Sequence, residues 1–250
     1  MSLQMINDVL FVIQARMGST RLPKKVMKPI GGMALIDFIV ERIKQSDHYN
    51  HKTQNLMIAT TVEAEDDLLA HYCLSKGYKV FRGSELDVLQ RFAKIAQHFE
   101  PKTIVRLTGD NPFIDPALLS KMLEEHRQKK ANYTYTSGTP LGISGEMIDA
   151  SILREIDNFP LTQPEREHVT LYIRKHPEQF QLQLFTPPKE LAYPTYRFTI
   201  DTEEDYVFAT RLLEKAGGSI AVPTAELITI CEQNPEMVRL NQFVKQKDAE

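Results

Sequence analysis

The segment from Gln14 to Lys25 holds the residues that point most directly to chemistry. It follows the apolar run 9–13 and contains one glycine, two hydroxyl side chains, two arginines and two lysines. Backbone N–H groups and fixed cations beyond the carboxyl end of a buried strand form a cradle for polyanions. A solvated basic loop is the alternative. Because the segment contains neither G-x-x-x-x-G-K-[ST] nor G-x-G-x-x-G, we predict a nucleotide triphosphate held largely by side chains.

Two carboxylates stand where later strands are expected to end. Asp110 follows the run 103–107 in the sequence Gly-Asp-Asn-Pro, and Asp201 follows the short run 197–199. A carboxylate at the edge of a sheet can coordinate Mg²⁺, which prefers oxygen ligands and substrate phosphates. A strand-ending turn at Asp110 and a helix N-cap at Asp201 are the structural alternatives. Together with the cationic loop, the two acids form the set of groups that phosphoryl and nucleotidyl transfer require.

The composition limits which partners the chain can have. It has 250 residues, of which 42% are hydrophobic and 25% charged, and a formal net charge of −3. This size and composition predict one large domain with a substantial core. The slightly negative net charge produces no long-range electrostatic field that would attract nucleic acid. The two cysteines lie far apart, and no apolar stretch reaches membrane-spanning length. We therefore predict a reduced, cytoplasmic protein that binds neither nucleic acid nor membrane.

Short apolar runs alternate with helical periodicities, which predicts an α/β fold with a mostly parallel sheet between two layers of helices. The expected strands are 9–14, 55–60, 79–81, 103–107, 133–136, 181–185 and 197–199. The expected helices are 34–45, 63–76, 86–98, 116–130, 203–214 and 224–232. The stretch from about 137 to 194 departs from this rhythm and is rich in proline and glycine. We interpret it as an insertion or lid within a single domain, residues 1–250.

The motifs of this chain also form an ordered set. They are 14–23 followed by Lys25, then 58–61, 81–84, 87–89, 106–112, 165–170, 200–205 and 234–236 with Asn241. This set resembles the spore-coat-polysaccharide F-type branch of the cytidylyltransferases, which are relatives of the acylneuraminate and 3-deoxy-manno-octulosonate cytidylyltransferases. The resemblance spans nearly the whole chain in the expected order, which chance produces far less readily than any single motif.

The resemblance implies a three-layer GT-A-like nucleotide-diphospho-sugar transferase fold. It also implies the reaction CTP + sugar → CMP-sugar + pyrophosphate, used in surface polysaccharide biosynthesis, with a sugar acid as one class of acceptor. The residues that it implies for nucleotide binding are Arg16, Gly18, Ser19, Arg21, Lys25, Arg82, Ser84 and Asp87. Of these, Arg82, Ser84 and Asp87 would face the nucleobase, and the others the triphosphate.

By the same resemblance, Arg16, Lys25 and Asp110 would be catalytic, and Asp110 and Asp201 would ligate Mg²⁺. The acceptor-side residues would be Glu146, Arg166 and His168. A solvated Glu146, a surface loop role for Arg82 and a structural role for His168 are the alternatives. The relatives further imply a homodimer, with the stretch 137–194 as its contact.

Two positions depart from the family pattern. The family often has glycine before its loop lysine, where this chain has Lys24. A Cβ and an extra cation there would stiffen or crowd the loop, unless the side chain points into solvent. The family also commonly shows Pro-Asp-Gly in the insertion, whereas this chain reads Pro-Leu-Gly at 140–142. Because this acid is missing, the sequence does not determine which sugar is the acceptor.

Three other functions are compatible with parts of this pattern. A glycosyltransferase on the same fold usually carries an Asp-x-Asp metal motif, which the sequence around Asp110 does not supply. A uridylyl- or guanylyltransferase stays open, because base choice depends on a few loop contacts. A nucleotide-binding partner protein without catalytic activity is the third. The presence of Arg16, Lys25, Asp110 and Asp201 together argues against that last function.

Overall fold

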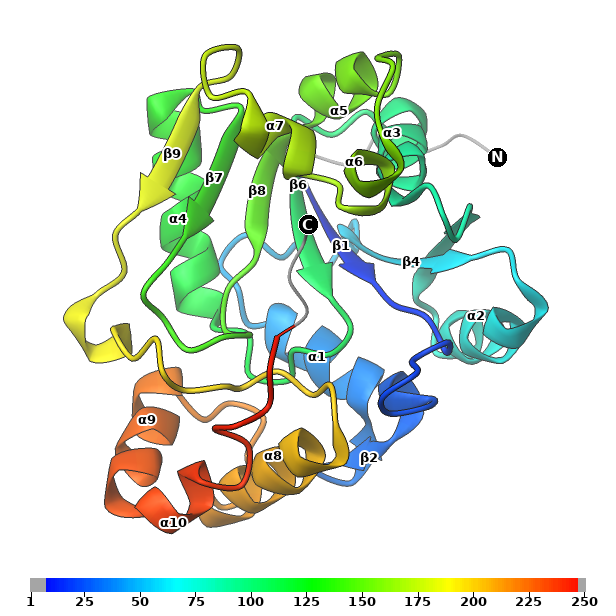
Figure 1. Cartoon of the computed structure of the whole chain (residues 1–250). Helices are drawn as coiled ribbons and strands as arrows, with labels where there is room; N and C mark the ends of the chain where they lie inside the picture. The colour runs from blue at the N-terminus through cyan, green and yellow to red at the C-terminus, as the bar shows by residue number, and fades with distance from the viewer. Residues whose placement is uncertain (1–7, 247–250) are drawn as a thin grey trace.

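A seven-stranded sheet organises the chain, and the computed structural model describes it with the rest of residues 8–246. Its strands are β1 (Val9–Gln14), β4 (Leu56–Thr61), β5 (Lys79–Gly83), β6 (Thr103–Thr108), β7 (Tyr133–Thr136), β8 (Glu146–Asp149) and β9 (Leu182–Phe185). They lie in the order β5-β4-β1-β6-β8-β7-β9, and β8 runs antiparallel to both its neighbours. Figure 1 shows helices on both sides of the sheet, so the predicted mostly parallel α/β fold is confirmed.

The strands divide their side chains between two hydrophobic cores. In β1, Phe11 and Ile13 belong to one core and Leu10 and Val12 to the other, and all four are at most 1% exposed. A strand that is covered on both faces reads as a continuous apolar run rather than an alternating one. The sequence pattern therefore located β1 at its observed bounds.

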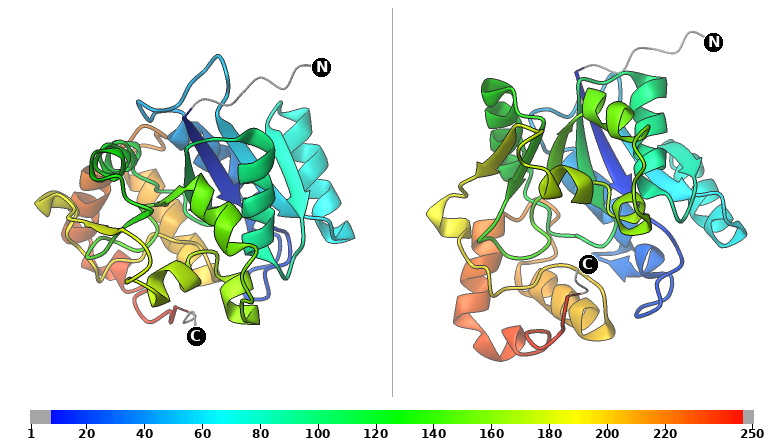
Figure 2. Two further views of the ribbon diagram at one scale, coloured as in Figure 1. Left: turned by 90° about the horizontal axis from the view of Figure 1, so that it is seen from above. Right: turned by 45° about the horizontal axis from the view of Figure 1, so that its top comes forward.

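Two sets of helices complete these cores (Figure 2). The first core receives apolar side chains from α1 (Leu35–Ile43), α2 (Asp67–Ser75), α4 (Pro116–Lys129), α8 (Glu203–Lys215) and α9 (Thr224–Gln233). The second receives them from α3 (Val88–Phe99), α5 (Ala150–Ile156) and α7 (Leu171–Lys175). The short elements are η1 (Lys25–Met27), β2 (Pro29–Ile30), β3 (Met33–Ala34), η2 (Ala64–Asp66), α6 (Gln163–Glu167), η3 (Lys189–Leu191) and α10 (Pro235–Val238).

Side-chain caps fix where the helices begin. The Asp115 carboxylate accepts a hydrogen bond from the Leu118 backbone N–H at 2.7 Å, with Pro116 in the first turn of α4. At α8, Thr202 and Asp205 form a capping box. Both helix starts were predicted from the sequence, because a capping side chain and its N–H partner lie three residues apart in the chain. At α8, however, the N-cap was expected at Asp201, and the structure places it at Thr202.

The stretch 137–194 and the run 197–199 differ from expectation. Residues 197–199 form a single bridge between Arg197 and Leu141 instead of a strand. Within the seven-stranded sheet, the strand that the sequence pattern missed is β8, which lies inside the expected lid and fills the sheet between β6 and β7; the two short strands β2 and β3 of the second sheet were also not expected. A Cβ on Gly145 would lie 2.5 Å from Leu107 Cδ2, so the chain enters β8 through a close approach to β6. This pairing is non-local and leaves little local pattern.

Two expectations concern the cellular setting. Within residues 8–246, no helix combines the length and the apolar character needed to cross a bilayer. Cys73 and Cys231 are both free and buried, and burial raises the pKa of each thiol to about 12. Both thiols are therefore protonated and shielded from reaction near neutral pH.

Arg42 is a buried charge that joins three parts of the fold. It lies in α1 and is 1% exposed. Its Nε donates to the Ile114 carbonyl at 2.8 Å, and its Nη1 donates to the carbonyls of Ile220 at 2.6 Å and Val222 at 3.0 Å. Burial lowers its pKa to about 10, so the guanidinium stays charged at neutral pH. Arg42 thereby fixes α1 to the segments that precede α4 and α9.

We expect Arg42→Met to lower the free energy of unfolding by about 3 kcal/mol, because three carbonyls, two of them buried, lose their donor. Urea denaturation followed by circular dichroism measures this loss. Arg211→Met, at an exposed arginine of α8, is the matched control and changes stability little. Equal stability of the two variants would contradict the role assigned to Arg42.

Candidate active site

Strands β1 and β6 bring the two most important loops together. The strands are parallel neighbours, and Gln14 pairs with Thr108 at their carboxyl ends. The Gly109 N–H then donates to the Gln14 carbonyl at 2.8 Å. A Cβ on Gly109 would lie 2.8 Å from the Ala15 Cβ, so only glycine permits this approach. The loop that carries Arg16 and the turn that carries Asp110 therefore leave the sheet side by side.

The cationic loop 14–25 is held from beneath by a buried carboxylate. Asp66 is 0% exposed and accepts a hydrogen bond from the Met17 N–H at 2.6 Å. Within the loop, the Ser19 and Lys24 N–H groups donate to the Met17 carbonyl at 2.8 and 3.2 Å. The Ser19 Oγ accepts from the Leu22 N–H at 3.3 Å. The loop is thus ordered by its own backbone and by Asp66.

A pocket of about 320 Å³ opens at these strand ends. It brings together seven of the residues predicted from the sequence, which are Arg16, Gly18, Ser19, Arg21, Lys25, Asp110 and Asp201. His168, predicted on the acceptor side, also lines it. A larger cavity of about 610 Å³ lies elsewhere, around Pro101 and His126, and contains none of these residues.

Lys25 joins the two predicted metal carboxylates. Its Nζ lies 2.8 Å from Asp110 Oδ2 and 2.8 Å from Asp201 Oδ1, and Arg21 lies 3.1 Å from Asp201. Burial opposes both charges, but the ion pairs prevail: the pKa of Lys25 is raised by Asp110 and Asp201, and the pKa of Asp201 is lowered by Lys25 and Arg21. Lys25 and Asp201 are therefore both ionised at neutral pH.

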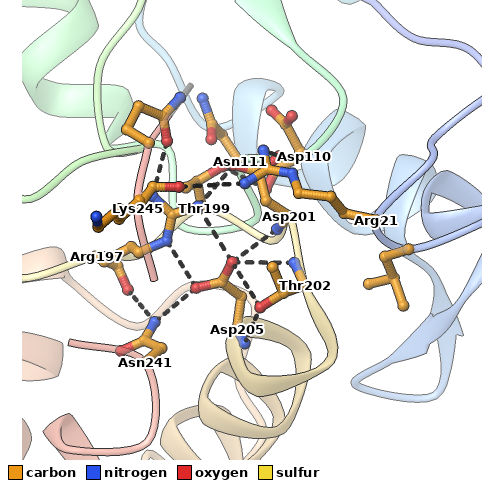
Figure 3. A network of polar contacts seen from close by, with 12 residues as sticks. Arg21, Asp110, Asn111, Arg197, Thr199, Asp201, Thr202, Asp205, Asn241 and Lys245 are labelled. Carbon is orange, nitrogen blue, oxygen red and sulfur yellow. Dashed lines mark hydrogen bonds and ion pairs between the residues drawn. The ribbon is translucent and has the colours of Figure 1, made fainter. Parts of the chain in front are cut away.

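This arrangement fits a Mg²⁺ ion that arrives with phosphates. Asp110 and Asp201 already share one cation, the Lys25 ammonium, so their carboxylates are close enough to share another. Figure 3 shows Asp110 and Asp201 close together beside Arg21. No group of three or more His, Cys, Asp or Glu side chains within residues 8–246 is placed to hold a metal by itself. Mg²⁺ commonly takes one or two carboxylates and fills its other positions with water and substrate phosphates.

Comparison with known proteins places the chain in a family. Residues 10–242 match the family model for cytidylyltransferases. The chain belongs to the cytidylyltransferase family. It is 47% identical over 232 residues to the spore coat polysaccharide biosynthesis protein SpsF of Bacillus subtilis, with 92% of this chain and 97% of that protein covered. The resemblance read from the motifs is therefore confirmed.

Solved structures agree with this assignment. A cytidylyltransferase from Leptospira borgpetersenii serovar Hardjo-bovis matches 96% of this chain and 99% of its own, at 32% identity and a TM-score of 0.84. A CMP:2-keto-3-deoxy-manno-octonic acid synthetase complexed with CTP matches 83% of this chain and 99% of its own, at 16% identity and a TM-score of 0.64. That second likeness shows that the fold is shared.

The three residues expected at the nucleobase lie outside the pocket lining. Arg82 donates to the Thr61 carbonyl at 2.8 Å and pairs with Asp67 at 2.7 Å. The Ser84 Oγ accepts from the Asp87 N–H at 3.0 Å, and Asp87 caps α3. Ser84 and Asp87 thus organise the turn between β5 and α3, whereas Arg82 joins β5 to the end of β4 and the segment that follows it. A role in base recognition stays a prediction for all three.

The predicted acceptor residues separate into three places. Glu146 is bound by Arg106 and Tyr133 and accepts from Thr170 Oγ1 at 3.0 Å. Burial opposes its charge, yet Arg106 and these hydrogen bonds lower its pKa. Arg166 pairs with Asp157 at 2.6 Å and lies 3.5 Å from Asp87. Of the three acceptor residues, His168 alone lines the pocket.

Two arginines of the pocket were missed by the sequence analysis. Arg91, on α3, is 3% exposed, and burial lowers its pKa to about 10. Arg106, on β6, reaches Gln14 Oε1 at 3.1 Å and Glu146. Within the described chain, the Nε of each lacks a hydrogen-bond partner. The sequence did contain a signal for both residues, since each is an arginine among the apolar residues of its element. Burying a charge costs free energy unless it is paired, so a buried arginine indicates a site that supplies a partner.

Lys24 occupies the position where the family often has glycine. Its φ is 56° and its ψ is 25°, a left-handed conformation that costs a residue with a Cβ about 1–2 kcal/mol. The side chain is exposed, so its charge points into solvent rather than into the site. Backbone conformation therefore explains why glycine suits this position.

We expect Lys24→Gly to raise the free energy of unfolding by about 1 kcal/mol, because relief of the left-handed strain outweighs the entropy that glycine adds to the unfolded chain. Chemical denaturation measures this gain. Lys24→Ala removes the same charge but keeps a Cβ, and we expect no gain from it. A gain of equal size in both variants would assign the effect to the charge instead.

Proposed function

We propose that this cytidylyltransferase moves a cytidylyl group from CTP to a hydroxyl of a sugar and releases pyrophosphate, for surface polysaccharide biosynthesis. The observation that carries the proposal is the contact of Lys25 with both Asp110 and Asp201 inside the pocket of the cationic loop. When a polyanion and its divalent cation bind, the polyanion would take the place of the two carboxylates beside Lys25, and the divalent cation would take the place of Lys25 beside Asp110 and Asp201. The names of the relatives support the choice of nucleotide and pathway.

The cationic and the acidic residues of the pocket would have different roles. Arg16, Arg21 and Lys25 would hold the triphosphate and stabilise the charge that develops as a sugar oxygen bonds to the α-phosphorus. In that step the bond between the α-phosphorus and the oxygen that bridges to the β-phosphorus breaks, pyrophosphate leaves, and the proton of the sugar hydroxyl passes to solvent water. Mg²⁺, bound by Asp110 and Asp201, would supply further charge neutralisation at the phosphates.

The cationic side chains of the pocket outside the loop favour an acceptor with negative charge. Arg91, Arg106 and His168 line the pocket together with the cationic loop. Glu85 and Glu167 also line it, and Glu85 pairs with Arg16. Because Glu146 already compensates Arg106, Arg91 is the residue that most favours an anionic group. We therefore propose sugar acids among the acceptors.

Two further expectations accompany this function. A cytoplasmic location follows from the use of CTP and from the reduced cysteines. A homodimer, with its contact in the stretch 137–194, follows from the family resemblance. Gel filtration with light scattering measures the second directly.

The reaction itself is tested by pyrophosphate release from each of the four common nucleoside triphosphates, with a panel of sugars and sugar acids, with and without Mg²⁺. We expect release with CTP, an acidic sugar and Mg²⁺ together. A preference for another triphosphate would overturn the cytidylyl assignment. Binding of CTP with no release for any acceptor would favour a nucleotide-binding partner protein.

Asp110→Asn and Asp201→Asn test the two carboxylates. We expect each to lower Mg²⁺-dependent turnover at least about 100-fold while the thermal unfolding midpoint stays near that of the wild type. Glu203→Gln is the matched control, because this exposed carboxylate lies close by, at the start of α8, and pairs with Lys28 at 3.3 Å rather than with a residue of the pocket. Full activity of either aspartate variant would remove that residue from the site.

A further inference from the structure

The two oxygens of Asp201 have different partners. Oδ1 contacts Lys25 and Arg21 on the pocket side, at 2.8 and 3.1 Å. Oδ2 accepts a hydrogen bond from Arg197 Nη2 at 2.6 Å on the opposite side (Figure 3). An aspartate carboxylate turns readily about its terminal torsion, so a fixed partner for one oxygen also fixes where the other points.

Arg197 is itself held by a fully buried carboxylate. Asp205 is 0% exposed, and its Oδ1 accepts from Arg197 Nε at 2.8 Å. Its Oδ2 accepts from the backbone N–H groups of Asp201 at 2.9 Å and Thr202 at 3.1 Å. Asp205 therefore orients both the guanidinium and the backbone of the residue that this guanidinium contacts.

The segment after α10 completes the arrangement from the end of the chain. Asn241 is 2% exposed, and its Nδ2 donates to the Arg197 carbonyl at 2.9 Å and to Asp205 Oδ1 at 3.0 Å. Gln246 Oε1 accepts from Arg197 Nη1 at 2.7 Å. Arg21 Nη1 donates to the Lys245 carbonyl at 3.3 Å. In Figure 1 this red segment returns from α10 toward the ends of β1 and β6.

We infer that Arg197, held by Asp205 and by Asn241 of the C-terminal segment, is a positioning residue that engages Asp201 Oδ2 and thereby presents Oδ1 to the divalent cation. The inference rests on the proposed function, because it assumes that Asp201 is a metal ligand. Groups that orient a ligand are commonly worth about 10–100-fold in metal affinity. A cap for α8 alone would not need the Arg197–Asp201 contact, since the N–H groups already reach Asp205.

The test measures metal affinity apart from turnover. Mn²⁺ replaces Mg²⁺ as the probe, and free Mn²⁺ is followed by electron paramagnetic resonance with CTP present and no acceptor, relative to the same titration of CTP without protein. We expect Arg197→Lys to weaken Mn²⁺ binding about 10-fold, because lysine keeps the charge but lacks the planar fork with which arginine binds Asp205 through Nε and Asp201 through Nη2. Asn241→Ala weakens it by a smaller factor.

Asn234→Ala is the matched control. This asparagine lies in the same region and donates to the Ile230 carbonyl at 2.7 Å, but it has no contact with Arg197 or Asp205. Thermal unfolding of every variant shows that it is folded. If Arg197→Lys does not fold, Asn241→Ala and Gln246→Ala, the latter at an exposed residue, carry the test.

Mn²⁺ affinity within about twofold of the wild type in all folded Arg197, Asn241 and Gln246 variants would overturn the positioning role. Asp201→Asn separates this result from a failure of the proposed function. If Asp201→Asn loses Mn²⁺ while the positioning variants keep it, only the inference fails. If Asp201→Asn also keeps Mn²⁺, the metal assignment fails and the inference fails with it.

Discussion

The site depends on one charge balance, that between Lys25 and the carboxylates of Asp110 and Asp201. Two carboxylates held near each other repel unless a cation lies between them. Here the cation comes from the loop after β1, one acid from the turn after β6, and the other from the segment before α8. Three segments far apart in the sequence thus converge on one ammonium group. In the proposed function, the same balance would make the pocket receptive to a metal–triphosphate complex, which carries both signs of charge.

A second layer of buried carboxylates gives these loops their shape. Asp66 lies beneath the cationic loop and binds the Met17 N–H, and Asp205 lies beneath Asp201 and binds its N–H. Both are 0% exposed. Each therefore depends on its hydrogen bonds, since a buried charge without partners costs several kcal/mol. The loops that would meet substrate are consequently fixed before substrate arrives, which reduces the reorganisation required during the reaction.

The sheet supplies the geometry on which these layers rest. Because β1 and β6 are parallel neighbours in register, their carboxyl ends reach the same edge, and Gly109 lets the two following loops touch. The antiparallel β8 then brings Glu146 beside Arg106. The Glu146 carboxylate thereby compensates the positive charge that Arg106 places in the sheet next to the pocket. On the other side, α8 and the C-terminal segment close around Arg197.

The sequence by itself determined what short-range physics controls. Continuous apolar runs located β1 and β6, capping side chains located α4 and α8, and the cationic loop and Asp110 follow directly from strand ends. Only the tertiary structure decided the rest. The strand β8, the pairing of Glu146 with Arg106 and the entry of Arg91 into the pocket all depend on contacts between distant segments. Such contacts form because a buried charge or an open strand edge is unfavourable without a partner. The partner comes from a distant segment, so the local sequence pattern does not indicate which residue it is.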